Sequence, residues 1–209
     1  MHPLFRNATV IPVLTIERER DAVPLARALG DGGLHVIEVT FRTEAAAAAI
    51  GAITAEMPQV TVGAGTLLRA ADVAAAVGAG ARFLVSPGTT PQLAAAALAT
   101  ELPYLPGVAT PSEIMAARAL GICVMKLFPA EALGGVALLR ALAPVFPGIA
   151  FCPTGGVDER VAEHYLALPN VPFVGGSWMA PRDAIAAGDW GRIRRLAERA
   201  AAIGHKEAA

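Results

Sequence analysis

Residues 35–66, "HVIEVTFRTEAAAAAIGAITAEMPQVTVGAGT", contain one complete strand–helix–strand pattern. The run "HVIEVTF" alternates between two sets of side chains, which is typical of a β-strand with two different faces. An alanine-rich segment with helical spacing follows, and "VTVGAGT" then has the character of a second strand. Two strands joined through a helix form the repeating unit of α/β proteins, so this stretch predicts an α/β fold.

The same pattern continues along the whole chain. Eight β-like runs begin at Val10, His35, Val60, Arg82, Pro103, Ile122, Ile149 and Val171. Eight βα units in 209 residues predict a compact (β/α)8 barrel, with residues 1–209 as a single domain. An open doubly wound sheet is the alternative, but the glycine-rich fingerprint that such a sheet carries near its first strand is absent. The predicted helix ends are Thr43, Thr110 and Asp158 at N-termini and Gly30 and Gly121 at C-termini.

Composition excludes several classes of protein. Apolar residues make up 55% of the chain, charged residues 17%, and the net charge is -1, so nucleic-acid binding has no electrostatic support. No apolar run approaches the roughly 20 residues that cross a bilayer, and the start "MHPLFRNATV" does not resemble a secretion signal. We therefore expect a cytoplasmic protein with no membrane or nucleic-acid partner. Cys123 and Cys152 are expected to be buried free thiols.

Lysine is rare in this chain, and one lysine lies in an apolar run. The sequence has only Lys126 and Lys206 among its 17 Lys and Arg residues. Lys126 belongs to "VMKLFPAE" (124–131), where strand alternation groups it with Val124 and Phe128. The same alternation in "HVIEVTFR" groups Glu38 with Arg42 and leaves an apolar set to pack against helices. Barrel geometry therefore predicts that Lys126 and Glu38 both point inward and meet.

An inward-facing lysine has a chemical use that arginine does not. Burial lowers the pKa of a lysine ammonium group, and the neutral amine can attack a ketone to form a Schiff base. A guanidinium group keeps its proton. Glu38 is then the candidate for moving protons between substrate and solvent. The alternative interpretation is a buried Lys–Glu ion pair with a purely structural role.

Candidate anion-binding groups lie near the predicted strand ends. Arg42 is suited to bind a carboxylate through two hydrogen bonds, and the alternative is a solvated charge at the end of a strand. Thr66 is either a second ligand of the same carboxylate or a helix N-cap. The segments "PTGGV" (153–157) and "VGGSW" (174–178) expose backbone N–H groups at the two loops where barrels often bind phosphate. Tight turns are the alternative. The four histidines have no metal-ligand spacing, so no metal site is predicted.

Seven segments in this order resemble one family. They are "IEVTFRT", "VGAGTL", "SPG", "PGVATPSE", "MKLFPAE", "FCPTGGV" and "GGSWM". Together, between Val10 and Arg199, they are similar to the 2-keto-3-deoxy-6-phosphogluconate (KDPG) aldolases, the class I aldolases of the Entner–Doudoroff pathway. The resemblance implies a homotrimeric (β/α)8 barrel without metal or other cofactor. It also implies a site in which Lys126 forms the Schiff base and Glu38 is the acid/base. Arg42 and Thr66 would hold the pyruvate-like end of the substrate, and Pro87 and Phe128 would line the pocket. The phosphate would be held by Gly155, Gly156, Gly176 and Ser177.

The implied reaction cleaves KDPG to pyruvate and glyceraldehyde 3-phosphate. Alternatives within the family are cleavage of the C4 epimer, 2-keto-3-deoxy-6-phosphogalactonate, and of 4-hydroxy-2-oxoglutarate. Thr154 precedes Gly155, and we hypothesise that its hydroxyl lies near C4 and favours one epimer. Two interpretations from other classes are a non-catalytic phosphate-binding barrel and a phosphosugar isomerase. The segment before the first strand is short, which predicts a reduced leading helix.

Overall fold

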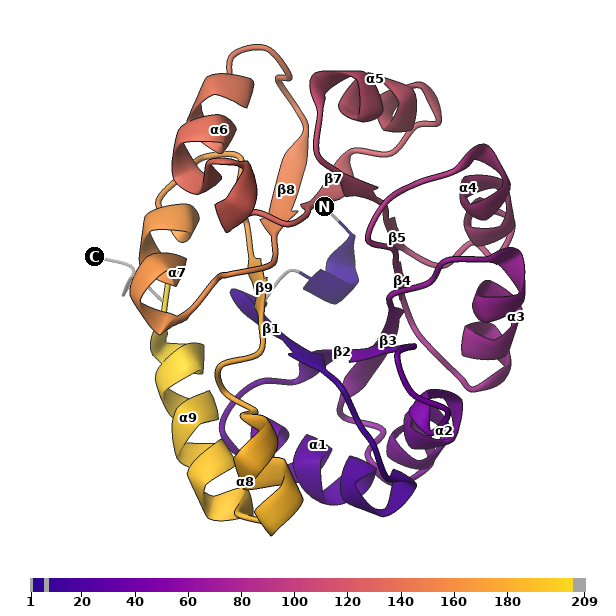
Figure 1. The fold of residues 1–209 in the computed structure, drawn as a ribbon, viewed down its shortest axis with the longest axis vertical. Helices are drawn as coiled ribbons and strands as arrows, with labels where there is room; N and C mark the ends of the chain where they lie inside the picture. Colours follow the sequence, from indigo (N-terminus) through magenta and orange to yellow (C-terminus); the bar gives the residue numbers. More distant parts are fainter. Residues whose placement is uncertain (1, 6–7, 205–209) are drawn as a thin grey trace.

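A computed structural model describes residues 2–5 and 8–204, in which parallel strands form a ring with helices on its outside (Figure 1). The strands are β1 (Val10–Leu14), β2 (Val36–Thr40), β3 (Thr61–Gly65), β4 (Leu84–Val85), β5 (Tyr104–Leu105), β6 (Gly107–Val108), β7 (Val124–Leu127), β8 (Ala150–Pro153) and β9 (Val174–Gly176). Each of the eight predicted runs therefore contains a strand, and the fifth run contains two.

Pro106 divides the fifth run because proline has no N–H to donate to a neighbouring strand. The strands consequently form two sheets, with the orders β5-β4-β3-β2-β1-β9 and β6-β7-β8. The Pro106 carbonyl still accepts a hydrogen bond of 2.8 Å from the backbone N–H of Lys126. An isolated parallel bridge between Thr154 and Gly175 joins β8 to β9. These links close the ring and confirm the predicted (β/α)8 barrel.

Helices connect successive strands, except β5 and β6, and cover the outside of the ring (Figure 1). They are α1 (Ala22–Asp31), α2 (Ala46–Glu56), α3 (Ala70–Gly78), α4 (Pro91–Leu98), α5 (Pro111–Ala119), α6 (Gly135–Leu142), α7 (Glu159–Leu166), α8 (Arg182–Ala187) and α9 (Trp190–Ala202). The short 3-10 helices among the described residues are η1 (Pro3–Phe5), η2 (Glu19–Asp21) and η3 (Glu131–Leu133). No helix within the described part of the chain has both the length and the apolar character needed to span a membrane.

The predicted helix ends are partly correct. Thr110 caps α5 and Asp158 caps α7 through their side chains, and Gly121, at φ 82°, follows the end of α5. The prediction for Thr43 is wrong, because α2 begins three residues later and the Thr43 hydroxyl instead donates to the Ile16 carbonyl at 2.6 Å. The prediction for Gly30 is also wrong, because α1 continues through Asp31.

The inside of the barrel has its own small hydrophobic core. It consists of Phe5, Ile11, Phe83, Val85, Leu105, Cys152 and Phe173. The ring of Phe5 stacks on Phe173 at 5.1 Å between centroids and meets Phe83 edge-on at 5.2 Å. Phe5 comes from the three-residue η1. Whether a leading helix is reduced stays a prediction. The expectation for Cys152 is confirmed, whereas Cys123 is exposed, contrary to expectation.

Strand alternation separates this inner core from the larger core beneath the helices. On β2, Ile37 and Val39 belong to the outer core, while Val36 packs against the inner one. On β3 the inward positions include glycine, and a Cβ atom at Gly63 would overlap the Phe83 ring. The absence of a side chain at this position therefore makes room for a neighbour's aromatic ring.

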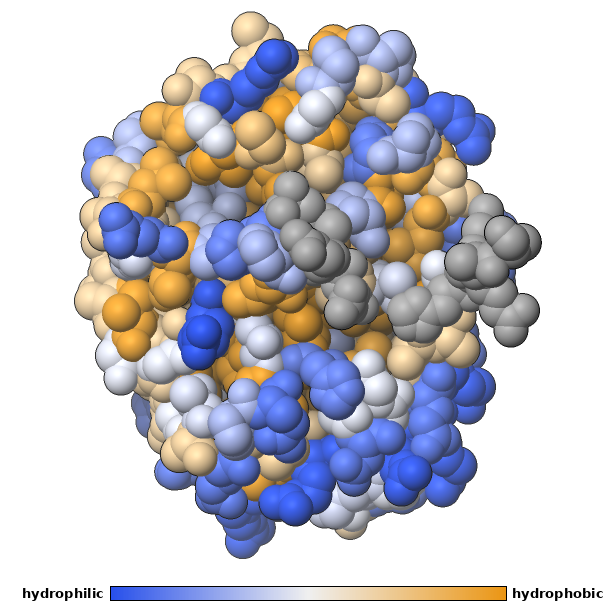
Figure 2. All heavy atoms as spheres, turned by 180° about the vertical axis from the view of Figure 1, so that it is seen from behind, coloured by the Kyte–Doolittle hydropathy of each residue, from blue (hydrophilic) through white to orange (hydrophobic). Residues whose placement is uncertain are grey.

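The outer surface is uneven in polarity. Figure 2 shows hydrophilic side chains gathered over the end of the molecule where Figure 1 places α1, α8 and α9. Apolar side chains are more frequent over the side of α3 and α4 (Figure 2). Large exposed apolar residues on or beside α3, α4 and α5 are Leu68, Val77, Leu98, Met115 and Leu120.

The glycine requirement inside the barrel predicts a stability difference between two alanine variants. Gly63→Ala should lower the free energy of unfolding by about 1–3 kcal/mol, because the added methyl overlaps Phe83 in a closed core. Gly78→Ala, at the end of α3, is the matched control, since its Cβ would meet nothing within 4 Å. The control should be neutral or stabilising by up to about 1 kcal/mol. Urea denaturation measures both, and equal stabilities would contradict the packing argument.

Candidate active site

Lys126 on β7 and Glu38 on β2 form a buried ion pair inside the barrel. The Lys126 Nζ atom lies 3.2 Å from Glu38 Oε1 and 3.5 Å from Oε2. Each residue is 4% exposed. The prediction that these side chains point inward and meet is therefore confirmed, although they are separated by 88 positions in the chain. Lys206, the other lysine, lies outside the described residues.

The neighbours of this pair provide space and an apolar floor. A Cβ atom at Gly65 of β3 would overlap the Glu38 carboxylate, so the glycine leaves room for Glu38. Cys152 is the register partner of Lys126 on β8, and burial raises the pKa of its thiol to about 12. That thiol is therefore protonated at neutral pH and is a poor nucleophile. The primary amine of Lys126 is the other candidate nucleophile beside Glu38.

The pair has the geometry needed for proton exchange. At 3.2 Å, a lysine ammonium can pass a proton to the facing carboxylate, which leaves a neutral amine and a carboxylic acid. Loss of both charges together removes the cost of burying either one alone. The same two groups can therefore serve as an ion pair at rest and as a nucleophile with an adjacent acid during a reaction.

A cavity of about 470 Å³ opens at the carboxyl ends of the strands. Its lining includes seven of the predicted site residues: Arg42, Phe128, Thr154, Gly155, Gly156, Gly176 and Ser177. Phe128 connects the cavity to the buried pair, since Lys126 Nζ lies 5.6 Å from the centroid of its ring. The volume falls within the range of about 300–1,000 Å³ that is usual for small-molecule sites.

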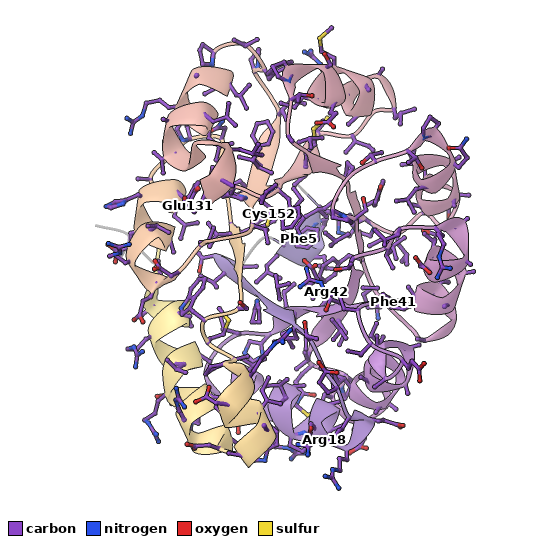
Figure 3. The ribbon with its side chains drawn as sticks, viewed as in Figure 1. Phe5, Arg18, Phe41, Arg42, Glu131 and Cys152 are labelled. Carbon is purple, nitrogen blue, oxygen red and sulfur yellow. The ribbon has the colours of Figure 1, made fainter. Side chains whose placement is uncertain are left out.

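Arg42 and Thr66 contact each other where β2 and β3 end. The Arg42 Nε atom donates to Thr66 Oγ1 at 3.1 Å, and Thr66 has the unusual φ of 57°. Figure 3 shows Arg42 over the interior of the ring, while its neighbour Phe41 lies on the helix side. Thr66 does not cap α3, whose N-cap is Arg69. Arginine and threonine together can hold a carboxylate at this point.

Thr66 and Pro87 are the two predicted binding residues that do not line the cavity. Thr66 is linked to it through Arg42. Pro87 is half-buried after β4, and its carbonyl lies so close to Gly107 that a Cβ there would overlap it. Pro87 thus borders the β5–β6 junction next to β7, and its role in binding stays a prediction.

The loops after β8 and β9 have the backbone that the glycine pairs predict. Gly155 and Gly156 have φ values of 96° and 81°, which residues with a side chain rarely adopt. A Cβ at Gly176 would overlap the Trp178 ring, so glycine is also required there. Ser177 is exposed in the same loop. These loops bring backbone N–H groups and one hydroxyl to the cavity, which suits a phosphate.

Glu131, to which the sequence assigned no role, fixes one of these loops. Its backbone N–H donates to the Gly155 carbonyl at 3.1 Å, and the N–H of Ala130 donates to the Thr154 carbonyl at 2.8 Å. The Glu131 carboxylate accepts a hydrogen bond from the buried Tyr165 hydroxyl of α7. Burial, together with this carboxylate, raises the pKa of Tyr165. Figure 3 shows Glu131 beside α6 and α7, so the loop after β7 holds the loop after β8 in place.

Two polar residues that line the cavity escaped the sequence reasoning. Thr15 directly follows β1, so the rule that strand ends carry site residues gives a signal for it. Arg182 is the first residue of α8, and no local pattern distinguishes it from the fourteen other arginines. Within residues 2–5 and 8–204, no cluster of three or more His, Cys, Asp or Glu side chains is arranged to hold a metal ion.

Comparisons with known proteins agree with this geometry. The sequence model of the family described as "Aldolase: KDPG and KHG aldolase" matches residues 1–196. A 2-dehydro-3-deoxy-phosphogluconate aldolase from Pseudomonas aeruginosa is 49% identical over 94% of this chain and 90% of its own length. These matches extend over nearly the whole chain, so they do not depend on one motif.

Two solved structures have the same fold at high identity. One is the KDPG aldolase from Legionella pneumophila with pyruvate captured at low pH as a covalent carbinolamine intermediate; it is 45% identical, with a TM-score of 0.91, over 93% of this chain and 95% of that one. The other is the KDPG aldolase of Zymomonas mobilis with 3-phosphoglycerate. It is 45% identical, has a TM-score of 0.90, and the match covers 99% of this chain and 96% of that one. This chain therefore belongs to the KDPG and KHG aldolase family of lyases.

Proposed function

We propose that this protein is a class I aldolase that cleaves KDPG to pyruvate and glyceraldehyde 3-phosphate through a Schiff base on Lys126. The observation that carries the proposal is the buried Lys126–Glu38 pair, at 3.2 Å, beneath a cavity with anion-binding groups at its mouth. A purely structural ion pair has no need of such a cavity above it. An amine that attacks a ketone requires both the apolar surroundings and the adjacent proton acceptor.

The first half of the reaction makes the imine. Glu38 takes a proton from the Lys126 ammonium, and the free amine attacks the C2 ketone of the substrate. The carbinolamine that forms then loses water, because Glu38 returns its proton to the departing hydroxyl group. The products are a protonated imine and Glu38 as a carboxylate again. This imine withdraws electrons from C3, which weakens the C3–C4 bond. The carbinolamine trapped in the Legionella relative is an intermediate of this type.

The second half breaks the carbon–carbon bond. Glu38, directly or through a water molecule, removes the proton of the C4 hydroxyl. The C3–C4 electron pair moves into the imine to form an enamine, and C4 leaves as the aldehyde carbon of glyceraldehyde 3-phosphate. Protonation of the enamine at C3, followed by hydrolysis, releases pyruvate and restores Lys126. Every bond change uses the amine, one carboxyl group and water, so the mechanism needs no cofactor.

The remaining site residues hold the two charged ends of the substrate. Arg42 and Thr66 bind the C1 carboxylate, and Pro87 and Phe128 border the reacting carbons. The loop groups bind the phosphate through Gly155, Gly156, Gly176 and Ser177. The 3-phosphoglycerate in the Zymomonas relative carries both a carboxylate and a phosphate, which supports a site with two anion-binding ends. Fixing both ends aligns C2 with the amine.

We also propose that residues 1–209 act as one (β/α)8 domain in the cytoplasm. The matches along nearly the full length of the chain support a single domain. Its ligands are the phosphorylated keto-deoxy sugar acid, pyruvate and glyceraldehyde 3-phosphate, with no nucleic acid or membrane as partner. The net charge of -1 supports the lack of a nucleic-acid partner.

Borohydride trapping tests the Schiff base directly. Incubation with pyruvate and sodium borohydride should reduce the imine and leave a stable adduct on Lys126, mapped by mass spectrometry. Lys206 is an internal control, since it should remain unmodified. Lys126→Met should form no adduct, and Glu38→Gln should lower the rate of cleavage by about 10²–10⁴-fold through loss of the proton acceptor. Circular dichroism of each variant separates loss of chemistry from loss of fold.

The same experiment distinguishes the rival interpretations. A non-catalytic barrel and a phosphosugar isomerase have no covalent amine intermediate, so neither yields an adduct with pyruvate. Absence of the adduct from a folded wild-type protein would count decisively against the aldolase mechanism.

Thr154 is the residue that we propose to determine which C4 epimer is preferred. It is 5% exposed and lines the cavity, and its hydroxyl lies 3.3 Å from the Cys152 carbonyl. We expect Thr154→Val to change the ratio of kcat/KM for KDPG and 2-keto-3-deoxy-6-phosphogalactonate by about 2–10-fold, the usual effect of one hydrogen bond. Thr154→Ser keeps the hydroxyl and should retain the wild-type ratio. Identical ratios of kcat/KM in the valine variant and the wild type would show that Thr154 does not determine the preferred C4 epimer.

We propose a homotrimer, as the family resemblance implies, with the apolar side of α3–α5 at the contact. The exposed Leu68, Val77, Leu98, Met115 and Leu120 support this side. Sedimentation equilibrium should give three times the mass of one chain. Met115→Glu should weaken the assembly, whereas Val145→Glu, of similar exposure (62% against 63%), is the control. A monomeric wild-type protein would refute the trimer, and equal effects of the two variants would refute the placement.

A further inference from the structure

The cavity above the buried pair carries two cations. Among the described residues that line it are Arg42 and Arg182, and the lining includes no aspartate or glutamate. The groups that sequence reasoning assigns to the phosphate are backbone N–H groups and one hydroxyl, all of them neutral. A phosphorylated sugar acid carries one carboxylate and one phosphate, so the two arginines match its two charged ends in number and sign.

The two arginines follow different strands of the barrel. Arg42 follows β2, and its Nε atom donates to Thr66, which places it at the carboxylate end. Arg182 lies five residues after Ser177, beyond the turn in which the Ala180 N–H donates to the Ser177 carbonyl at 3.0 Å. It therefore begins α8 at the end of the short loop that starts after Gly176 with Ser177, the two proposed phosphate ligands of this segment.

Arg182 is available to bind a ligand. It forms no ion pair with any described residue. The adjacent Asp183 is engaged by Arg192 at 2.6 Å, so it does not compete for the Arg182 guanidinium. A second hollow, which Arg182 also lines, contains Asp21 and Glu17; Asp21 is paired with Arg18 at 2.7 Å. Glu17 is then the unpaired acidic neighbour in that hollow among the described residues.

We propose that Arg182 binds the substrate's phosphate and so determines the preference for a six-carbon phosphorylated substrate over 4-hydroxy-2-oxoglutarate. This proposal rests on the proposed aldolase function. In KDPG the phosphate lies on C6, two carbons beyond C4. In 4-hydroxy-2-oxoglutarate the second anion is a carboxylate bonded directly to C4. A guanidinium beside the loop that carries Gly176 and Ser177 is placed to bind the first anion and not the second, so it selects by length as well as by charge.

Two substitutions at this position separate charge from geometry. Arg182→Gln removes the charge and keeps a polar side chain, while Arg182→Lys keeps the charge and loses the planar, bidentate donor. Both act on an exposed residue, so the fold should persist. The matched control is Arg195→Gln on α9, which removes the same charge from an exposed arginine that lines none of the described hollows.

The experiment compares kcat/KM for KDPG and for 4-hydroxy-2-oxoglutarate, together with pyruvate trapping by borohydride. For Arg182→Gln we expect kcat/KM for KDPG to fall by about 10-fold or more, mainly through KM, because a charge-assisted contact to phosphate is lost. The value for 4-hydroxy-2-oxoglutarate and the yield of trapped pyruvate should stay within about twofold, since neither ligand reaches Arg182. The kcat/KM of Arg182→Lys for KDPG should lie between the values of the wild type and Arg182→Gln. Arg195→Gln should have the wild-type kcat/KM for both substrates.

Three outcomes would overturn the proposal. Equal kcat/KM for KDPG in Arg182→Gln and Arg195→Gln would show that Arg182 makes no contact with the phosphate that contributes to catalysis or binding. An equal fall for both substrates would indicate a general effect on the site in place of phosphate selection. A wild-type protein that forms no pyruvate adduct and cleaves neither substrate would instead refute the aldolase function, and this proposal with it.

Discussion

The site depends on keeping an ammonium and a carboxylate together inside a protein. Lys126 and Glu38 are each 4% exposed, and a buried charge without a partner destabilises a fold by about 3–5 kcal/mol. Their contact at 3.2 Å offsets much of that cost. The barrel is suited to this task because it places β2 and β7 on opposite sides of a space narrow enough for one pair of side chains to cross. Closure of the ring therefore matters to the chemistry as well as to stability.

Space inside the ring is distributed among unequal side chains. Below the ion pair, Phe5, Phe83 and Phe173 fill the interior, and Gly63 leaves room for Phe83. At the level of the pair, Gly65 leaves room for the Glu38 carboxylate. Glycine is therefore required at both positions of "VTVGAGT" because a neighbouring side chain occupies the space of a Cβ atom, and not because the backbone turns there. The aromatic rings thus fill the barrel on one side of the pair, and Phe128, whose ring centroid lies 5.6 Å from Lys126 Nζ, links the amine to the cavity on the other.

The features that follow from short-range rules were predictable from the sequence. Alternation of side chains every two residues placed Lys126 and Glu38 inside the barrel, and the spacing of the eight runs indicated the ring. Features set by tertiary contacts were not predictable. Thr43 resembles a helix cap, but the Ile16 carbonyl from another segment binds its hydroxyl. Arg182 lies on a six-residue helix whose position against the phosphate loops is visible only in three dimensions. Glu131 acts through Tyr165, 34 residues away.

The two proposed ends of the site offer different physical means of binding an anion. At the carboxylate end, Arg42 is held by Thr66, and a fixed guanidinium can align C2 with the amine. At the proposed phosphate end, glycine backbone with positive φ and Ser177 offer neutral donors, and the Gly155 carbonyl accepts a hydrogen bond of 3.1 Å from the Glu131 N–H. Neutral donors alone distinguish weakly between anions of different charge. A cation at this end, the role that we propose for Arg182, adds a preference for the more highly charged ligand. Substrate choice and bond cleavage are then controlled by separate groups, so the former can change while Lys126 and Glu38 stay the same.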